Sequence, residues 1–152
     1  MEFQSIEDVL DFAIQEEAEA AAFYRGLAAV MERPEMRRAL EGFAREEENH
    51  RAKLEAMKSG DLPVLSPGKD VRDLGIADYL VDAEITPEMD YQQALAVAMQ
   101  KEKSAFRLYS LLAEAAEDEE IGKAFRALAQ EEAGHKLRFE IEYDDGVLNQ
   151  AY

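Results

Sequence analysis

The chain has 152 residues, 47% hydrophobic and 34% charged, which is long and apolar enough to fold around a core. Its net charge of −17 argues against nucleic acid or an anionic membrane as a partner, because both are bound through clustered Lys and Arg. It contains no cysteine, which excludes disulfides, zinc ribbons, iron–sulfur clusters and a thiol nucleophile within the chain. There is no secretory-signal pattern and no apolar run near the ~18 residues of a membrane span, so we expect a cytoplasmic protein.

The first helix is predicted from Ile6 to about Met31. Ser5 suits its N-cap, and Asp8 stands three residues later, as in a capping box. Positions reached by alternating steps of four and three residues share one helix face, and here they form a mostly apolar seam. That seam carries one carboxylate, Glu17, and Tyr24 follows it two turns later.

The second helix is predicted from Pro34 to about Ser59, with Gly60 beyond its end. Its seam contains Glu47 and His50, three residues apart and therefore on the same face. A buried carboxylate without compensation costs several kcal/mol, so a metal ion is the obvious partner. The other seam residues are apolar: Met36, Leu40, Phe43, Leu54 and Met57.

Residues 5–59 therefore form a helical hairpin, because the turn at Arg33-Pro34 is short. A connector at 60–86 follows, and its Gly and Pro residues preclude one continuous helix. A short helical piece is plausible around Ile76–Val81. A connector of this length can cross the length of a bundle.

A second hairpin is predicted over residues 87–145. Its first helix starts at Thr86-Pro87-Glu88, which supplies a cap, an N1 proline and a first-turn acid, and it runs to about Ala116. Asp118 can cap the last helix, which we expect to end near Asp144. The tail after it shows no readable structure.

The two hairpins repeat each other with an offset of 85 residues, which indicates an internal duplication. Six ionisable seam residues result, and they include both histidines of the chain. One Glu from each of two helices and Glu-x-x-His from each of the other two is the ligand set of ferritin-like di-iron carboxylate bundles. We therefore expect an all-α, ferritin-like four-helix bundle, a single domain with one long crossover. The six residues are Glu17, Glu47, His50, Glu102, Glu132 and His135.

Four carboxylates in one dry site repel each other and raise one another's pKa, and two dications would neutralise them. Carboxylate and imidazole ligands without thiolate favour iron or manganese, whereas zinc prefers a tetrahedron of four ligands. Taken alone, either histidine would be read as an ordinary core residue. Tyr24 and Tyr109 are read either as core aromatics or as hydrogen-bond donors to a ligand carboxylate on another helix. Four neighbouring acids point off the seam and are expected in solvent: Glu16, Glu46, Glu48 and Glu131.

These motifs resemble the rubrerythrin-like branch of the ferritin superfamily over all four helices. The stretches that carry the resemblance are Ala13-Ile14-Gln15-Glu16-Glu17 with Phe23-Tyr24, Glu47-Glu48-Asn49-His50, Glu102 with Tyr109, and Glu131-Glu132-Ala133-Gly134-His135. The resemblance implies a non-haem di-iron centre that reacts with oxygen or hydrogen peroxide. It also implies that Glu47 and Glu132 bridge the irons, and that Glu17, His50, Glu102 and His135 are terminal ligands.

The chain departs from full-length rubrerythrins in two ways. It has no cysteine for the rubredoxin domain that feeds electrons to the centre, and residues 103–106 offer no additional carboxylate. We therefore expect an oxidoreductase that binds two irons, with manganese possible, and that oxidises Fe²⁺ with O₂ or H₂O₂ in iron handling and oxidative-stress protection. The rivals are a peroxide reductase with an external electron donor and a redox-inert metal-binding or structural bundle. Phe12 and Phe23 lie off the seam and predict a homo-oligomer, with a dimer favoured.

Overall fold

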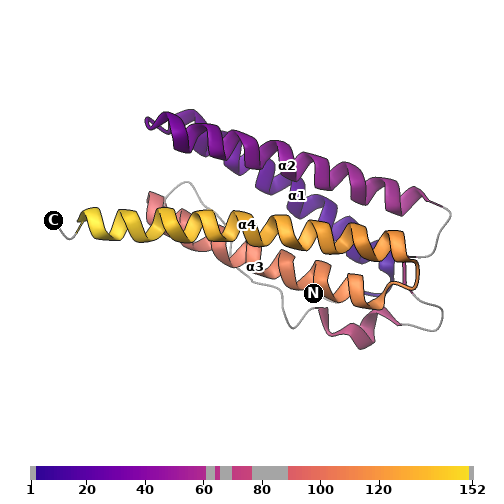
Figure 1. Ribbon diagram of the computed structural model, residues 1–152. Helices are drawn as coiled ribbons and strands as arrows, with labels where there is room; N and C mark the ends of the chain where they lie inside the picture. Colours follow the sequence, from indigo (N-terminus) through magenta and orange to yellow (C-terminus); the bar gives the residue numbers. More distant parts are fainter. Residues whose placement is uncertain (1–2, 61–63, 66–69, 77–88, 151–152) are drawn as a thin grey trace. The chain divides into compact units, whose positions relative to one another are not determined.

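A computed structural model describes residues 3–60, 64–65, 70–76 and 89–150 of the chain. In these ranges it contains α-helices and a short 3₁₀ helix but no strand, which confirms the all-α prediction (Figure 1). The elements in order are α1 (Ile6–Val30), α2 (Pro34–Ser59), η1 (Val71–Leu74), α3 (Tyr91–Ala115) and α4 (Glu119–Gln150).

The chain divides into two compact units. In the first hairpin α1 packs along α2, and in the second hairpin α3 packs along α4 (Figure 1). Both hairpins of the sequence prediction are therefore present. No helix in the described part of the chain is long and apolar enough to cross a membrane.

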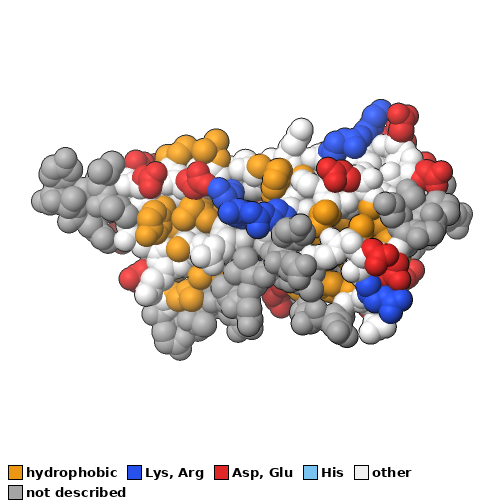
Figure 2. Space-filling model, turned by 90° about the horizontal axis from the view of Figure 1, so that it is seen from below, with side chains coloured by type: hydrophobic (Ala, Val, Ile, Leu, Met, Phe, Trp, Pro, Cys, Tyr) orange, Lys and Arg blue, Asp and Glu red, His pale blue; other side chains and the backbone are white. Residues whose placement is uncertain are grey.

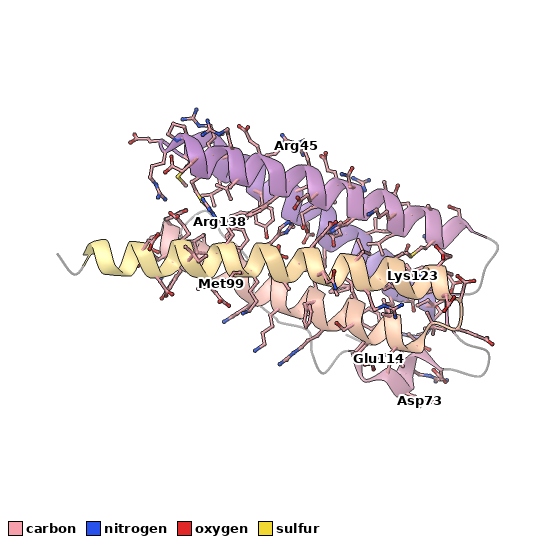
Figure 3. The ribbon with its side chains drawn as sticks, in the orientation of Figure 1. Arg45, Asp73, Met99, Glu114, Lys123 and Arg138 are labelled. Carbon is pink, nitrogen blue, oxygen red and sulfur yellow. The ribbon has the colours of Figure 1, made fainter. Side chains whose placement is uncertain are left out.

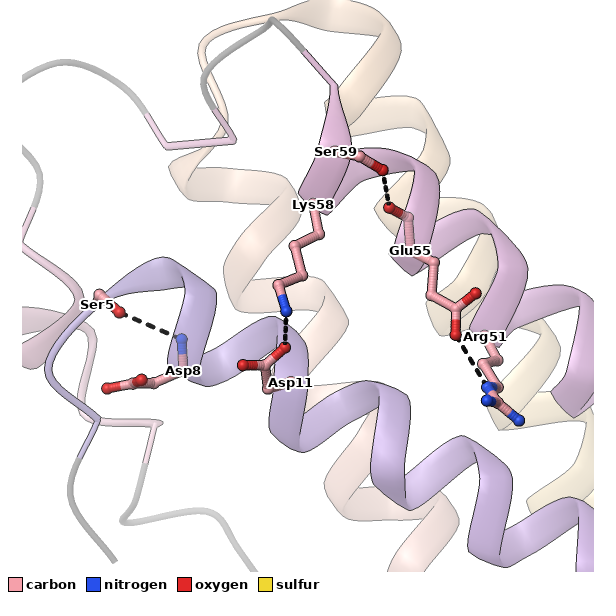
Figure 4. Close-up of polar contacts among 7 residues, drawn as sticks. All are labelled: Ser5, Asp8, Asp11, Arg51, Glu55, Lys58 and Ser59. Carbon is pink, nitrogen blue, oxygen red and sulfur yellow. Dashed lines mark hydrogen bonds and ion pairs between the residues drawn. The ribbon is translucent and has the colours of Figure 1, made fainter.

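The ends of the first hairpin follow the predicted signals. The Ser5 hydroxyl accepts a hydrogen bond from the backbone N–H of Asp8 at 3.2 Å, and Pro34 occupies the first turn of α2 (Figure 4). The Asp8 carboxylate accepts from the N–H of Gln4 at 2.9 Å, one residue before the N-cap. The cap is thus as predicted, while the reciprocal bond of a capping box is displaced by one residue.

Polar contacts also tie α2 to α1 and close its last turn. The Lys58 ammonium forms an ion pair with Asp11 of α1 (Figure 4). The Ser59 hydroxyl donates to the backbone carbonyl of Glu55 at 2.7 Å, and the Glu55 carboxylate pairs with Arg51 at 3.0 Å. These groups are solvent-exposed, so they fix the alignment of α2 along α1 more than they add to the stability of the hairpin.

The second hairpin begins later than the sequence predicted. The predicted start at 86–88 lies outside the described residues, and the described α3 begins at Tyr91. The reason is a complete capping box: the Asp90 carboxylate accepts from the N–H of Gln93 at 2.8 Å, and the Gln93 side chain accepts from the N–H of Asp90 at 3.0 Å. Asp118 caps α4 as predicted, with its carboxylate 3.0 Å from the N–H of Ile121.

The predicted end of α4 near Asp144 is wrong. The helix continues through Gly146 to Gln150, so part of the tail expected to lack structure is helical. Glycine costs about 1 kcal/mol in a helix, which weakens the helix without ending it. No proline follows to force a stop.

Little of the connector is described. Its described part includes the single turn η1, which places Val71 in the core, and Gly75 follows with a positive φ of 65° that favours glycine. Ile76 is buried, while the rest of the predicted helical piece, residues 77–81, lies outside the described part.

The buried faces follow the predicted seams, with a drift in α1. Strict alternation of fours and threes predicts Ala20 and Leu27 in the core, whereas Ala21 and Ala28 are the buried residues. A straight helix turns once per 3.6 residues, so a seam with a period of 3.5 drifts by about 20° every seven residues, which favours the later of two neighbouring positions further along α1. Glu17 lies in the middle of the helix, where the two patterns coincide.

Candidate metal centre

The first hairpin brings together one triad of ionisable side chains. Glu17 on α1 and Glu47 and His50 on α2 are at most 2% exposed. His50 Nδ1 lies 3.5 Å from Glu17 Oε2 and 3.8 Å from Glu47 Oε1. One ligand atom from each of the three residues lies within 4.8 Å of the others. Three positions predicted as ligands therefore meet at one point in the hairpin core.

The second hairpin contains the equivalent triad. Glu102 on α3 and Glu132 and His135 on α4 are also at most 2% exposed. His135 Nδ1 lies 3.7 Å from Glu102 Oε2, and the three residues again offer ligand atoms within 4.8 Å of one another. The duplication seen in the sequence is thus repeated in the geometry of the buried polar groups.

The donor separations fit a shared metal ion. N–H···O hydrogen bonds are about 2.7–3.2 Å long, so 3.5–3.8 Å is longer than direct pairing requires. Nitrogen and oxygen ligands each about 2.1 Å from one ion, with an angle of about 110–120° between them, are separated by about 3.4–3.7 Å. Each triad therefore has the separations and the donor types of half of a dinuclear carboxylate site.

The charge of each triad also calls for a cation. Two carboxylates and one imidazole sum to −2 with a neutral histidine and to −1 with a protonated one. Water cannot reach groups that are 0–2% exposed, and uncompensated buried charge costs several kcal/mol. A dication in each triad would remove this repulsion and keep the imidazole neutral as a ligand.

Tyr24 and Tyr109 are both buried beside the triads of their own hairpins. The Tyr24 ring meets Phe43 edge-on, with centroids 6.3 Å apart, and the Tyr109 ring stacks on Phe125, also at 6.3 Å. The two tyrosines have different ring partners because the phenylalanine stands one turn earlier in α4 than in α2. With the offset of 85 residues, Phe43 corresponds to Leu128, and Leu40 corresponds to Phe125. Both tyrosines are therefore core aromatics. A hydrogen bond from each hydroxyl to a ligand carboxylate on another helix is compatible with this position and stays a prediction.

Of the four acidic residues that were predicted to lie in solvent, three are exposed and one is half-buried. Glu46, Glu48 and Glu131 are exposed, and Glu16 is half-buried. Glu48 pairs across the hairpin with Arg25, and this hydrogen bond lowers the pKa of the Glu48 carboxyl below its ordinary value. Of two adjacent glutamates on α2, Glu47 is therefore a buried ligand candidate, whereas Glu48 belongs to a surface ion pair.

Sequence reasoning missed one buried acid. Glu142 on α4 is 6% exposed, and its Oε1 accepts a hydrogen bond of 3.1 Å from the hydroxyl of Tyr91. The signal was available, because the α4 seam of Glu132, His135 and Phe139 reaches Glu142 with the next step of three.

The two off-seam phenylalanines, Phe12 and Phe23, are both half-buried. The Phe12 ring meets Phe3 edge-on with centroids 5.4 Å apart, and the Phe23 ring meets Tyr24 edge-on at 5.7 Å. Other apolar side chains reach the surface, and Figure 2 shows such groups among charged ones on one face. The large exposed apolar residues are Val30, Phe106, Leu137 and Ile141.

Comparisons with known proteins agree with the fold and with the character of these triads. No curated protein matches the chain. A structure described as a putative ferritin-like diiron-carboxylate protein from Thermotoga maritima has a TM-score of 0.79 and 19% identity, covering 96% of this chain and 99% of its own. A hypothetical protein from Pyrococcus furiosus has a TM-score of 0.69 and 27% identity, covering 92% and 89%.

The fold is thus the ferritin-like four-helix fold. Residues 8–143, which include both triads and all but the ends of the helices, match the Rubrerythrin family. The chain therefore belongs to the rubrerythrin family.

Proposed function

We propose that the protein binds two iron ions and oxidises Fe²⁺ with oxygen or hydrogen peroxide. The observation that carries the proposal is the buried Glu, Glu, His triad that occurs once in each hairpin, with the histidine Nδ1 3.5–3.8 Å from carboxylate oxygens. Manganese is an alternative occupant, because the donors are the same oxygen and nitrogen ligands.

In the proposed centre the two triads belong to one domain and share their ions. Glu17 and His50 would hold one ion and Glu102 and His135 the other, while Glu47 and Glu132 would be shared by both. Membership of the rubrerythrin family supports this division of roles. Each iron ion, when bound, can lose one electron reversibly. A two-electron oxidant such as peroxide therefore requires two iron ions.

The residues of the chain have three tasks in this reaction. The carboxylates bind Fe²⁺ and, being anionic, favour Fe³⁺ after oxidation. The imidazoles fill positions that water would otherwise take. The core residues around them, such as Tyr24 and Phe125, keep the site dry and the ligand rotamers fixed.

Ferroxidase chemistry is favoured over peroxidase turnover by the α3 sequence after Glu102. Lys103 is exposed, Ser104 is buried and Phe106 is partly exposed, so this stretch adds no carboxylate. The chain also has no cysteine with which to hold an electron-transfer metal of its own. Peroxide reduction with an external electron donor is the rival of the same class, and a redox-inert metal-binding or structural bundle is the rival of another class.

The test is anaerobic loading with Fe²⁺ followed by air or peroxide. We expect the absorption of an oxo-bridged ferric pair in the wild type and its loss in Glu132→Ala. Glu131→Ala is the matched control, since it removes the exposed neighbouring carboxylate. Peroxide consumption that requires added reduced rubredoxin would favour the rival reductase, and a site that binds iron without ferric absorption would favour the inert bundle.

We also propose a cytoplasmic location and a homo-oligomer, with a dimer favoured. Phe12 and Phe23 support self-association, because both are large apolar side chains that stay half-exposed on the hairpin. Sedimentation at micromolar concentration tests it, and a monomer there would contradict it.

A further inference from the structure

The repeat has a polar pair in the second hairpin where the first hairpin has an apolar one. The Tyr91 hydroxyl donates to Glu142 Oε1 at 3.1 Å, between the start of α3 and the C-terminal part of α4. With the offset of 85 residues, the equivalent positions are Ile6 and Met57. The first hairpin therefore has two aliphatic residues at the equivalent positions.

Packing alone therefore does not require a polar pair at these positions. Glu142 is 6% exposed, and a buried carboxylate is costly even with a hydrogen-bond donor. Arg138, labelled on α4 in Figure 3, lies one turn before Glu142. An ionised carboxylate only accepts hydrogen bonds, so the phenol proton points at it.

The pair lies in the same hairpin as the second triad but outside it. Glu142 is on the face of α4 that carries His135, and seven residues of helix separate them by about 10 Å. Tyr91 precedes Glu102 on α3 by eleven residues, or about 16 Å. At these separations neither group can be a ligand, whereas an electron can pass between them and the centre.

We propose that Tyr91 is a redox-active tyrosine and that Glu142 is its proton acceptor. A phenol that loses one electron becomes a strong acid, so its oxidation is easy only where a base already holds the proton. Tyr91 would supply a single electron when peroxide meets a protein that carries only one Fe²⁺. This inference rests on the proposed function, which provides the iron and the peroxide.

The step balances as follows. The Tyr91 O–H bond breaks, its proton moves to Glu142, and its electron goes to peroxide. One H₂O₂ accepts one electron from Fe²⁺ and one from Tyr91, together with two protons from solvent, and becomes two waters, while the phenol proton stays on Glu142. The products are Fe³⁺ and a neutral tyrosyl radical. A second Fe²⁺ later returns an electron, and Glu142 returns the proton. Without Tyr91, one Fe²⁺ would cleave peroxide to hydroxide and a free hydroxyl radical.

The experiment mixes anaerobic full-length protein, loaded with one Fe²⁺ per chain, with hydrogen peroxide and freezes it within milliseconds. Electron paramagnetic resonance records the tyrosyl radical, with ring-deuterated tyrosine to assign it, and a spin trap records free hydroxyl radical. The decisive variant is the double change Tyr91→Ile with Glu142→Met, which installs the pair of the first hairpin. Thermal melts check that it folds. Tyr143→Phe is the matched control beside Glu142.

We expect a tyrosyl radical in the wild type and in Tyr143→Phe, and none in the double variant or in Tyr91→Phe. Hydroxyl-radical yield should rise several-fold in those two, and Glu142→Gln should form the tyrosyl radical more slowly. An unchanged radical in Tyr91→Phe overturns the inference, and so does an unchanged rate in Glu142→Gln. Ferric absorption without any wild-type tyrosyl radical overturns the inference but leaves the proposed function standing, whereas absence of iron oxidation overturns both.

Discussion

His50 Nδ1 lies 3.5 Å from Glu17 Oε2, although the two residues are on different helices and 33 positions apart in the sequence. The second hairpin repeats this relation with the same sequence separation, at 3.7 Å. An imidazole and a carboxylate that lie this close in a dry core, but farther apart than in a good hydrogen bond, have the separation expected of two ligands of one metal ion.

Metal should stabilise the fold. The triads exist in the folded chain and not in the unfolded one, so binding adds RT ln(1 + [L]/Kd), about 4 kcal/mol at a thousandfold excess over Kd. We expect the melting temperature to rise when Fe²⁺ is added without oxygen, or when Mn²⁺ is added. Mg²⁺, which dehydrates reluctantly, is the control and should give a smaller shift. Equal melting temperatures with chelator and with Fe²⁺ would contradict the prediction.

Removing two acidic residues from the triads should separate stability from function. The double change Glu47→Leu with Glu132→Leu takes two buried carboxylates away and supplies apolar volume. We expect metal binding and iron oxidation to vanish while the metal-free protein becomes as stable or more stable, by up to about 4 kcal/mol. Urea unfolding with chelator measures this change.

The matched control is Glu46→Leu with Glu131→Leu, which removes the exposed neighbours of the same residues. It should keep metal binding. A metal-induced melting shift that survives in the Glu47, Glu132 variant would rule out the proposed ligand roles.

The protein should bind two irons per chain. Each hairpin contributes one complete triad, so anaerobic titration should saturate at two Fe²⁺. His50→Ala and His135→Ala should each lower saturation toward one, because each removes the nitrogen donor of a single triad. Wild-type saturation at one ion, or an unequal response of the two variants, would show that the hairpins are not equivalent.

The surface ion pair of Arg25 with Glu48 should make a small, pH-dependent contribution. The hydrogen bond from Arg25 lowers the pKa of Glu48 in the folded state, so the contribution is fully present above the ordinary pKa of a glutamate. It is lost as pH falls through the lowered value. Glu48→Gln should thus be slightly less stable than the wild type at neutral pH and equal to it in strong acid. The difference should shrink in high salt, because both groups are exposed.

Sequence patterns predicted the buried Glu and His residues of the triads better than the helix ends. Glu47 and His50 were identified because two polar residues interrupt an apolar face, and burial leaves such residues few roles. The end of α4 was missed because Gly146 only weakens a helix. The start of the described α3 was missed because Asp90 with Gln93 competes with Thr86 as a cap, and only the formed bonds decide between them. Glu142 was missed because its partner, Tyr91, is 51 residues away.

The exchange of Phe43 and Leu40 for Leu128 and Phe125 has a consequence for how the two halves have diverged. The summed side-chain volume at the two positions is the same in both hairpins, while the bulk has moved by one turn beside Tyr24 or Tyr109. Either substitution alone costs stability, since one opens a cavity and the other overfills the core. The two changes compensate each other only when they occur together. The halves therefore lose stability when they exchange single core residues at these positions.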